Sequence, residues 1–552
     1  MKIQYITNRI AAIFLIAIIG FSSCTDLTEK PFSVIPDRGY TFSNEEIKSL
    51  NGDVYQNLRW LYWGWNGTFD IYEESSDLIM TPLRIGIGWG DLYVTMHKHT
   101  YTATTGHFWT IWNQAYKTIN GCNQLLEYDI VKSAPVSAAE LRGIRGLSYY
   151  LLLDNFRNVP LDTIFTRDAG FLPEQEDPQK LFSFIEQEMK DVKTILKDED
   201  ILYGQFNYYA ACMVLAKMYL NYNAWFGTSD NSYYEKAYNE VNEVINDGKF
   251  TLSSAYTEPF MADGSTCSEI IYAIVYSKQY NATGNYLSNK CLHGGSKATF
   301  GLKSAPWNGS CAVPQFIDTY DMDDSRFSDT WLIGEQKDKS GASITIDGTP
   351  LIYTQSVHSI DNPGAYQMEG ARFHKYEIVS GEDGTYGDDV PFFRLTDAYM
   401  IKAECLLRLG GYNGETEQTA ADIVTMIRQR AFKSNPEKAI RTVEQLKGPS
   451  IYNYGHQENT GLEGEDDNWV ITEEGGNDIE LGGLLDDLAW EFVGEHHRRQ
   501  DLIRFQLTNG NNVYTGKSRF CFDAHNNSDK NIFPLPQDFL DANSKLVQNP
   551  GY

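Results

Sequence analysis

Apolar side chains recur at steps of three and four residues in several long stretches of the chain, and this spacing limits the fold more than any other feature. Such steps place side chains along one face of an α-helix, whereas a half-buried strand would show strict alternation. The periodic faces are Leu181, Ile185, Met189, Val192 and Leu196; Tyr208, Cys212, Leu215 and Tyr219; Ala398, Ile401, Cys405 and Leu409; and Leu481, Leu485, Leu488 and Phe492. We therefore expect a mainly α fold.

The helical stretches occur in pairs joined by short connections. Capping boxes at Ser43–Glu46 and Ser137–Glu140 are each expected to begin a helix. Paired helices are typical of a tetratricopeptide-like scaffold. The pairs here resemble a degenerate one, because no clean repeat of about 34 residues is visible. The expected pairs are about 109–130 with 137–156, 179–197 with 206–223, and 395–410 with 415–432.

Long irregular tracts rich in glycine, asparagine, aspartate, serine and aromatic residues interrupt the helices. Within them Ile270–Ser277 predicts a short strand. Loops of this length are unusual in a compact domain unless they are functional. We expect a single unit at 24–552, with a helical scaffold at about 40–60, 107–250 and 394–552, and a loop-rich ligand-binding face at about 60–108 and 250–394.

The first residues have the composition of a secretory signal. Lys2 and Arg9 precede an apolar run at Ile10–Phe21, which is too short to cross a bilayer that needs roughly 20 residues. Small residues then lead into Cys24, as in bacterial lipoprotein signals. We expect cleavage after residue 23 and a lipid on Cys24, so that the protein is anchored to a membrane without spanning it. The alternative is ordinary secretion, with Cys24 as a bystander.

The numbers of charged residues and the spacing of the cysteines exclude some classes of ligand. Lys and Arg number 46 and Asp and Glu number 74, and a net charge of −28 disfavours nucleic acid as a ligand. The cysteines form no C-x-x-C pair, and no Cys/His spacing suits zinc, so we expect no metal and no cofactor. Isolated buried thiols are the favoured state, and a disulfide among Cys267, Cys291 and Cys311 is the alternative.

No catalytic motif is present. The chain lacks G-x-S-x-G, a P-loop, G-x-G-x-x-G and H-E-x-x-H. The segment GEHHRRQD (Gly494–Asp501) is better explained by ion pairs with Glu491–Arg498 or Glu495–Arg499 spacing than by a metal. DMDDSR (Asp321–Arg326) lacks the glycine and glutamate of a calcium loop. A glycosidase needs only two suitably spaced carboxylates, and no pair stands out.

Aromatic residues in the loops are the strongest indication of a ligand site. LRWLYWGWNGTF (Leu58–Phe69), RIGIGWGDLY (Arg84–Tyr93) and KSAPWNGS (Lys303–Ser310) set indoles among glycine and asparagine, where they are hard to bury. Flat aromatic faces suit the C–H faces of sugars, and nearby polar groups can bind hydroxyls. The candidates are Trp89 and Trp307, with Arg84, Asp91 and Asn308 as polar helpers; the alternative is that each indole fills the scaffold.

Five stretches, in order along the chain, resemble the SusD/RagB family of outer-membrane nutrient-binding lipoproteins of Bacteroidetes. Arg157 and His496 stand where the family pattern has glycine. The stretches are HFWTIWNQAYKTINGCNQLLE (His107–Glu127), AELRGIRGLSYYLLLDNFRNVPL (Ala139–Leu161), RLTDAYMIKAECLLRLG (Arg394–Gly410), LAWEFVGEHHRRQDLIRF (Leu488–Phe505) and NIFPLPQDFLDANSKLVQNPGY (Asn531–Tyr552).

The resemblance implies a SusD-like fold and a non-enzymatic role at the outer membrane, on the cell surface. Members of the family bind oligosaccharides and sit over a SusC-like TonB-dependent transporter, and a minority handle peptides. It also adds Tyr280 and Tyr286 as candidate glycan contacts in the loop tracts. A peptide-binding RagB-like lid, a surface glycosidase and a scaffold that binds only proteins stay open as alternatives. The sequence does not identify the glycan.

Overall fold

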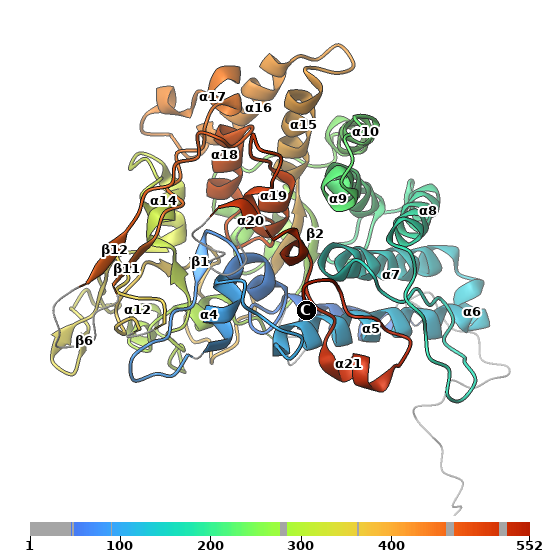
Figure 1. Ribbon diagram of the computed structural model, residues 1–552, viewed down its shortest axis with the longest axis horizontal. Coiled ribbons are helices and arrows are strands. Elements are labelled where there is room, and N and C mark those ends of the chain that lie inside the picture. The colour runs from blue at the N-terminus through green and yellow to red at the C-terminus, as the bar shows by residue number, and fades with distance from the viewer. Residues whose placement is uncertain are drawn as a thin grey trace, which may run out of the picture. The chain divides into compact units, whose positions relative to one another are not determined.

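The long helices pack in series, each against the next, as Figure 1 shows. The computed structural model describes residues 46, 49–89, 91–276, 284–361, 364–459, 468–517 and 527–552. The series confirms the expected mainly helical, tetratricopeptide-like scaffold. Its members in order are α3 Gly52–Tyr62, α5 Gly106–Glu127, α7 Pro135–Phe156, α8 Pro178–Leu196, α9 Tyr208–Phe226, α10 Ser232–Asn246, α15 Leu395–Leu409 and α16 Glu417–Gln429, with the short α6 Asp129–Lys132 between α5 and α7.

The apolar periodicity predicts these helices to within three residues at their ends in every expected pair. The face of α8 from Leu181 to Leu196 is buried, while its other sides are largely exposed. Helix α9 is buried on nearly all sides because α8 and α10 flank it and α7, α15 and α19 (Arg498–Arg504) also contact it. An amphipathic stripe is therefore enough for the outer helices, whereas nearly every side chain of the central helix is buried, including those of Lys217, Asn221 and Asn223.

The capping box expected at Ser137–Glu140 is wrong. Helix α7 begins two residues earlier, at Pro135, a residue that suits the first helical position. Ser137 and Glu140 lie inside the helix, where both accept hydrogen bonds from the side-chain amide of Asn51. Their oxygens thus attach α3 to α7 rather than cap a helix. Ser43, of the other expected box, lies outside the described residues.

A single long insertion separates two helices that pack together. Helix α10 ends at Asn246 and α15 begins at Leu395, yet the two are direct neighbours. Lys402 of α15 donates to Asn242 of α10 (2.9 Å), and Tyr238 of α10 donates to Glu415 (2.6 Å). The insertion therefore leaves the helical series at one point and returns to the same point.

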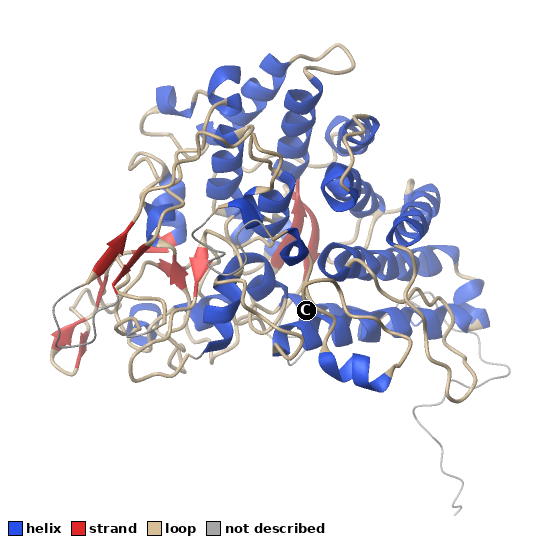
Figure 2. Cartoon of the chain, viewed as in Figure 1, coloured by secondary structure: helices blue, strands red, loops and turns tan. Residues whose placement is uncertain are grey.

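The insertion and the C-terminal third contain short helices and two-stranded antiparallel ladders (Figure 2). The strand expected at Ile270–Ser277 is present as β2, which is buried and pairs with β10. The strands are β1 Ile79–Met80, β2 Ile270–Ile274, β3 Cys311–Ala312, β4 Trp331–Leu332, β5 Gly334–Glu335, β6 Thr345–Ile346, β7 Thr349–Pro350, β8 Ile352–Tyr353, β9 Arg372–Phe373, β10 Val390–Arg394, β11 Gln457–Asn459 and β12 Trp469–Ile471. The remaining α-helices are α4 Asp91–His97, α11 Leu287–Cys291, α12 Ser296–Phe300, α13 Pro314–Ile317, α14 Ser325–Thr330, α17 Val443–Lys447, α18 Gly482–Phe492, α19 Arg498–Arg504, α20 Val513–Gly516 and α21 Gln537–Ala542; η1 Asp70–Glu74 is a π-helix, and η2 Glu258–Phe260, η3 Gly264–Thr266, η4 Pro436–Ala439 and η5 Ser528–Asn531 are 3₁₀ turns.

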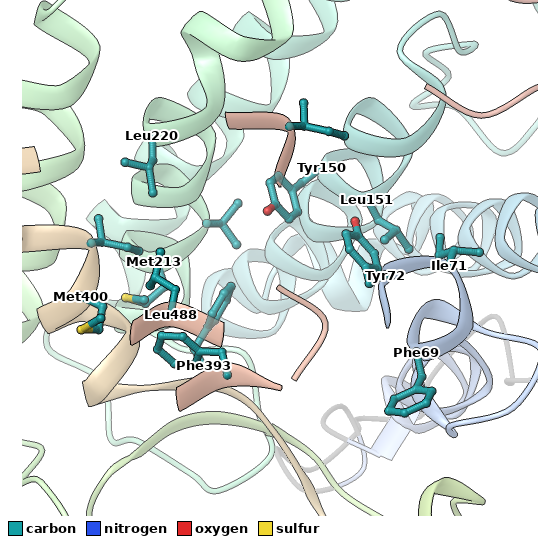
Figure 3. Packing of buried hydrophobic residues seen from close by; sticks show 14 of the residues in the cluster. Phe69, Ile71, Tyr72, Tyr150, Leu151, Met213, Leu220, Phe393, Met400 and Leu488 are labelled. Carbon is teal, nitrogen blue, oxygen red and sulfur yellow. The ribbon is translucent and has the colours of Figure 1, made fainter. Parts of the chain in front are cut away.

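One hydrophobic core joins the helical series to the loop-rich part. Side chains from the beginning of the chain, from the central helices and from the C-terminal helices point into it together, as Figure 3 shows. The described cysteines are free, so the disulfide alternative is wrong for Cys267, Cys291 and Cys311. None of the described helices combines the length and apolar character needed to span a membrane. The residues labelled in Figure 3 are Phe69, Ile71, Tyr72, Tyr150, Leu151, Met213, Leu220, Phe393, Met400 and Leu488.

The C-terminal segment is fixed by its amide side chains. Asn549 donates to the carbonyls of Phe156 and Phe533, and Gln548 both donates to and accepts from the backbone of Leu535. Asn543 donates to the carbonyl of Pro173. These bonds close the chain end over the C-terminus of α7, so the amides of this segment have a structural role.

Both residues that replace an expected glycine have left-handed backbone angles. Arg157, which follows α7, has φ +60°, and His496, between α18 and α19, has φ +66°. Side chains other than glycine are strained in this region. The glycines expected at these positions therefore reflect a backbone requirement that this chain meets at a cost.

Candidate functional site

Half-buried aromatic rings from three loop segments meet on the loop-rich part of the molecule. We call Trp60, Trp63, Trp65, Tyr286 and Trp307 the aromatic cluster. The Trp307 ring stacks on the Tyr286 ring, with 4.8 Å between centroids and 27° between planes. Trp65 presents its edge to both, at 5.2 and 5.8 Å. The result is a surface of several indole and phenol rings in contact.

The N-terminal part of the cluster continues from helix α3. Trp63 lies 4.3 Å from Trp60 and 5.1 Å from Tyr286, in edge-on contacts. The backbone N–H of Tyr286 donates to the Trp63 carbonyl (2.6 Å), which fixes the two loops together. The Trp63 indole N–H has no hydrogen-bond partner among the described residues. This donor is therefore both buried within the cluster and unpaired within the described part of the chain.

Trp89 is coupled to the loop that carries Trp307. Its indole N–H donates to the Trp307 carbonyl at 2.9 Å, and its ring lies edge-on to Tyr93 at 5.5 Å. A β-carbon built at Gly309 would come within 2.9 Å of the Trp89 ring, so glycine is required for this approach. The two tryptophans that the sequence singled out are therefore neighbours, and both are half-buried.

Arg84 is buried beneath these loops, with 1% of its surface exposed. Its guanidinium donates to the carbonyls of Gly309, Tyr366 and Glu369 at 2.9–3.0 Å. Burial, together with the neighbouring Arg372, lowers the pKa of Arg84 to about 9. The residue that we predicted as a polar contact thus holds two other loop segments, one at Gly309 and one at Tyr366–Glu369.

Asn308 is also buried, with 2% exposed and a left-handed φ of +60°. Its backbone N–H donates to the Leu292 carbonyl, while both polar atoms of its side chain lack partners among the described residues. Asp91 is the first residue of α4. Tyr280 and Cys24 lie outside the described residues.

A buried polar network joins the loops of the cluster. The Lys290 ammonium lies 2.5 Å from a carboxylate oxygen of Asp70 and 2.7 Å from one of Glu74, and none of these side chains is exposed. Asp70 also accepts from His107 and from the backbone N–H of Asn66. Burial alone would raise the pKa of Asp70, but Lys290 and His107 bring it down to about 2. The loops are therefore held by charge-assisted hydrogen bonds.

Sequence reasoning placed Trp60, Trp63 and Trp65 in a notable stretch but did not propose them as contacts. The signal was available, since the stretch Leu58–Phe69 sets five aromatic residues around Asn66 and Gly67. What the sequence does not reveal is that Tyr286 and Trp307, more than 200 residues later, complete the same surface.

The histidine-containing segment GEHHRRQD lies in the core. Burial lowers the pKa of His496 to about 4 and that of His497 well below its ordinary value. Glu495 accepts from Lys375 and Arg394. Among the described residues, no group of three or more His, Cys, Asp or Glu side chains is arranged to hold a metal ion. The aspartates of DMDDSR are likewise committed to Lys438 and Arg326.

The ion-pair cluster expected in this region exists, but the expected partners are wrong. Arg498 pairs with Asp77 at 2.6 Å, and Arg499 lies 3.6 Å from Asp154. Glu491 instead contacts Arg394 and arginines of two other segments. The helical spacing does not apply because the helix ends at Phe492 and resumes only at Arg498.

Comparisons with known proteins agree on one family. The family model described as the SusD family matches residues 214–552, more than half of the chain. The chain is 24% identical over 451 residues to the starch-binding protein SusD of Bacteroides thetaiotaomicron, covering 75% of this chain and 72% of that protein. It is 23% identical over 546 residues to the SusD-like protein P25 of Formosa agariphila, covering 92% and 90%.

Among solved structures, the surface glycan-binding protein A from Bacteroides thetaiotaomicron in complex with laminarihexaose is similar to this chain. The TM-score is 0.66 at 18% identity, and the match covers 92% of this chain and 100% of that one. At this level of identity the likeness shows that the two proteins share a fold.

Proposed function

This chain belongs to the SusD family, and we propose that it captures glycans at the cell surface through the aromatic cluster. The observation that carries the proposal is the Trp307–Tyr286 stack with Trp65 edge-on beside it. Aromatic walls with a few polar groups are the general form of a small-molecule site, and flat rings suit the C–H faces of sugars. Trp89 and Asn308 would complete the site, with Arg84 positioning it.

Two relatives support a glycan as the ligand class. One is named for binding starch, and the other was solved with laminarihexaose. Starch and laminarin are therefore the first glycans to test. Asp91, Tyr280 and Tyr286 remain proposed glycan contacts in the same loop tracts. The other predicted residues of the site also remain proposals.

We propose binding without catalysis. The acidic residues of η1 are Asp70, Glu73 and Glu74; all three are buried, and Asp70 and Glu74 are paired with Lys290. A glycosidase needs one carboxylate that can donate a proton and another that can reach the sugar. Burial keeps these three side chains from reaching a sugar.

We further infer that a lipid on Cys24 holds the protein on the outer membrane, where it passes oligosaccharides to a SusC-like TonB-dependent transporter. The support is the signal-like run at Ile10–Phe21 and the family membership. Mass spectrometry of protein purified from membranes is expected to find acylated Cys24 as the first residue. A mature chain that begins elsewhere and carries no lipid would contradict the anchor.

Retention of residues 25–552 on immobilised starch, laminarin and a wider glycan panel tests the function, with product analysis of each eluate. Trp307→Ala is expected to weaken binding about tenfold or more, about 1.4 kcal/mol, because ring stacking is lost. Its melting temperature should stay near that of the wild type, because the ring is only half-buried.

The matched control is Trp109→Ala. Trp109 is 41% exposed and stacks on Phe539, outside the aromatic cluster, so this variant should bind like the wild type. Equal affinity of Trp307→Ala and the wild type would remove the site assignment. Retention of peptides in place of sugars would favour the RagB-like alternative, and released sugar products would favour a glycosidase.

A further inference from the structure

A second group of exposed rings lies around the β11–β12 hairpin. We call His358, Tyr366 and Trp469 the hairpin platform. Tyr366 is 38% and Trp469 39% exposed, and the His358 ring lies between them, at 5.5 and 5.9 Å between centroids. Single exposed apolar residues are normal on protein surfaces, but a group of contacting rings contributed by separate segments indicates binding.

The backbone beneath the hairpin platform is fixed. One carboxylate oxygen of Glu369 accepts from the backbone N–H groups of both His358 and Tyr366, each at 3.0 Å. Asn459 of β11 donates its backbone N–H to the His358 carbonyl at 2.9 Å. Rings presented on a fixed backbone lose little conformational freedom when a ligand binds.

The hairpin platform is connected to the aromatic cluster through Arg84. The same guanidinium that donates to Gly309, next to the Trp307 loop, donates to the carbonyls of Tyr366 and Glu369. The backbone N–H of Ile85 also donates to the Ala365 carbonyl at 3.0 Å. Since Arg84 has five donors in a rigid plane, it holds the supports of both aromatic surfaces in one fixed arrangement.

Polar residues lie close in sequence to two rings of the hairpin platform, with Asp361 three residues after His358 and Gln367 next to Tyr366. Lys98 and Asp361 form an ion pair at 2.6 Å that is partly exposed. The Gln367 side chain lies beside Gly86, in the segment that runs on to Trp89. The Nε2 atom of His358 is buried, so the polar side chains that a ligand could reach are those of the partly exposed Lys98 and Asp361. Exposed rings with polar side chains nearby favour a sugar over an apolar protein surface or a lipid.

We propose that the hairpin platform is a second contact for the same glycan, so that one long polysaccharide binds both aromatic surfaces at once. This proposal rests on the proposed function and extends it to polymeric ligands. Two linked contacts raise the affinity for a ligand that reaches both, because the second contact forms within an existing complex. A short oligosaccharide held by the aromatic cluster gains nothing from the second.

Calorimetry with a trisaccharide and with the parent polymer tests the proposal, starting from laminarin and starch and their trisaccharides. Trp469→Ala is expected to weaken polymer binding at least about tenfold and to leave trisaccharide binding unchanged. Tyr366→Ala should behave in the same way, and it lies outside the hairpin in case Trp469→Ala disturbs β12. Trp307→Ala should weaken the binding of both the trisaccharide and the polymer. Trp109→Ala should leave the binding of both unchanged.

The outcomes separate this proposal from the function on which it rests. If Trp469→Ala and Tyr366→Ala, both folded by circular dichroism, bind the polymer like the wild type, the second contact is overturned while the proposed function stands. Equal losses for trisaccharide and polymer would overturn it as well, since the platform would then belong to the first site. A wild-type protein that binds no glycan overturns both.

Discussion

The charged core and the aromatic cluster both join segments that are far apart in the sequence, but they differ in burial. The charged core consists of Glu269, Lys375, Arg394, Arg430, Glu491 and Glu495. Both regions join side chains from segments far apart in sequence. In the charged core every carboxylate accepts from at least one cation and all the groups are buried. In the aromatic cluster the rings are partly exposed. Buried and paired charges mark a region that fixes the fold, whereas partly exposed rings form the surface that the proposed function assigns to a ligand.

Among the variants that test this contrast, Glu491→Ala is expected to change the free energy of unfolding most. Burial alone would raise the pKa of Glu491, but Arg430, Arg394 and Arg326 hold it well below its ordinary value. Removing one partner of a buried charge network leaves the others uncompensated, at a cost of about 3–5 kcal/mol. We expect a large loss in the free energy of unfolding by urea, with glycan binding lost only where the fold is lost.

Glu444→Ala is the matched control, because Glu444 is an exposed glutamate on α17. Its unfolding free energy should equal that of the wild type. If Glu491→Ala is as stable as this control, the charged core does not fix the fold, and the contrast with the aromatic cluster fails.

A smaller change in the free energy of unfolding, dependent on pH, is expected when Glu73 is replaced. Glu73 lies in η1 between Asp70 and Glu74 and accepts a hydrogen bond from the backbone N–H of His496. Burial raises the pKa of Glu73 to about 8, against the bonds from Gly494 and His496 that lower it. The folded protein therefore holds a proton that the unfolded chain releases near pH 4.5. The stability contributed by this group is complete below pH 4.5 and is lost as the pH rises toward 8.

Glu73→Gln imitates the protonated form at every pH. We expect its unfolding free energy to equal that of the wild type near pH 4 and to exceed it near pH 9, by at most a few kcal/mol, since one pKa unit corresponds to about 1.4 kcal/mol. Urea unfolding of both proteins at the two pH values measures this. A difference that does not change with pH would mean that the pKa of Glu73 is not raised in the folded protein.

The smallest expected change in stability concerns the backbone at His496, which lies between the charged core and the aromatic cluster. His496 adjoins Glu495 of the charged core and makes edge-on contacts with Tyr62 and Phe69, at 5.5 and 6.0 Å. Both His496→Ala and His496→Gly lose this ring, but only glycine adopts a φ of +66° without strain. We expect the glycine variant to be more stable than the alanine variant by roughly 1 kcal/mol in thermal unfolding. Equal stability would place the junction under no backbone constraint.

The sequence predicts the helices well because each buried face appears as apolar residues spaced three or four apart within the helix itself. Each turn of α8 repeats the same apolar face, so Leu181 to Leu196 can be read without knowledge of the neighbours. The mainly α fold and the family follow from such local signals. The capping box at Ser137 failed because α7 begins at Pro135, and the Ser137 oxygen accepts from Asn51, the residue that precedes α3.

The candidate site is predictable only in part, for the same reason. Glycine and asparagine around Trp89 and Trp307 mark these rings as unusual, and that signal is local. Whether Arg84 faces solvent or three backbone carbonyls depends on segments more than 200 residues away. The same applies to Glu491, whose partners lie on other elements while the helix that would have supplied local ones ends at Phe492.

The junction between α10 and α15 also bears on how such proteins diversify. Because the two helices pack directly, the insertion is a closed loop whose ends are already held together. The entropy of closing a loop grows only with the logarithm of its length, at about 0.6 kcal/mol for each doubling. Exposed loops within the insertion can therefore change in length at little entropic cost to the helices, as long as the segments that carry Glu269, Lys375 and Arg394 are kept. Under the proposed function, new ligand specificities can then arise without a new scaffold.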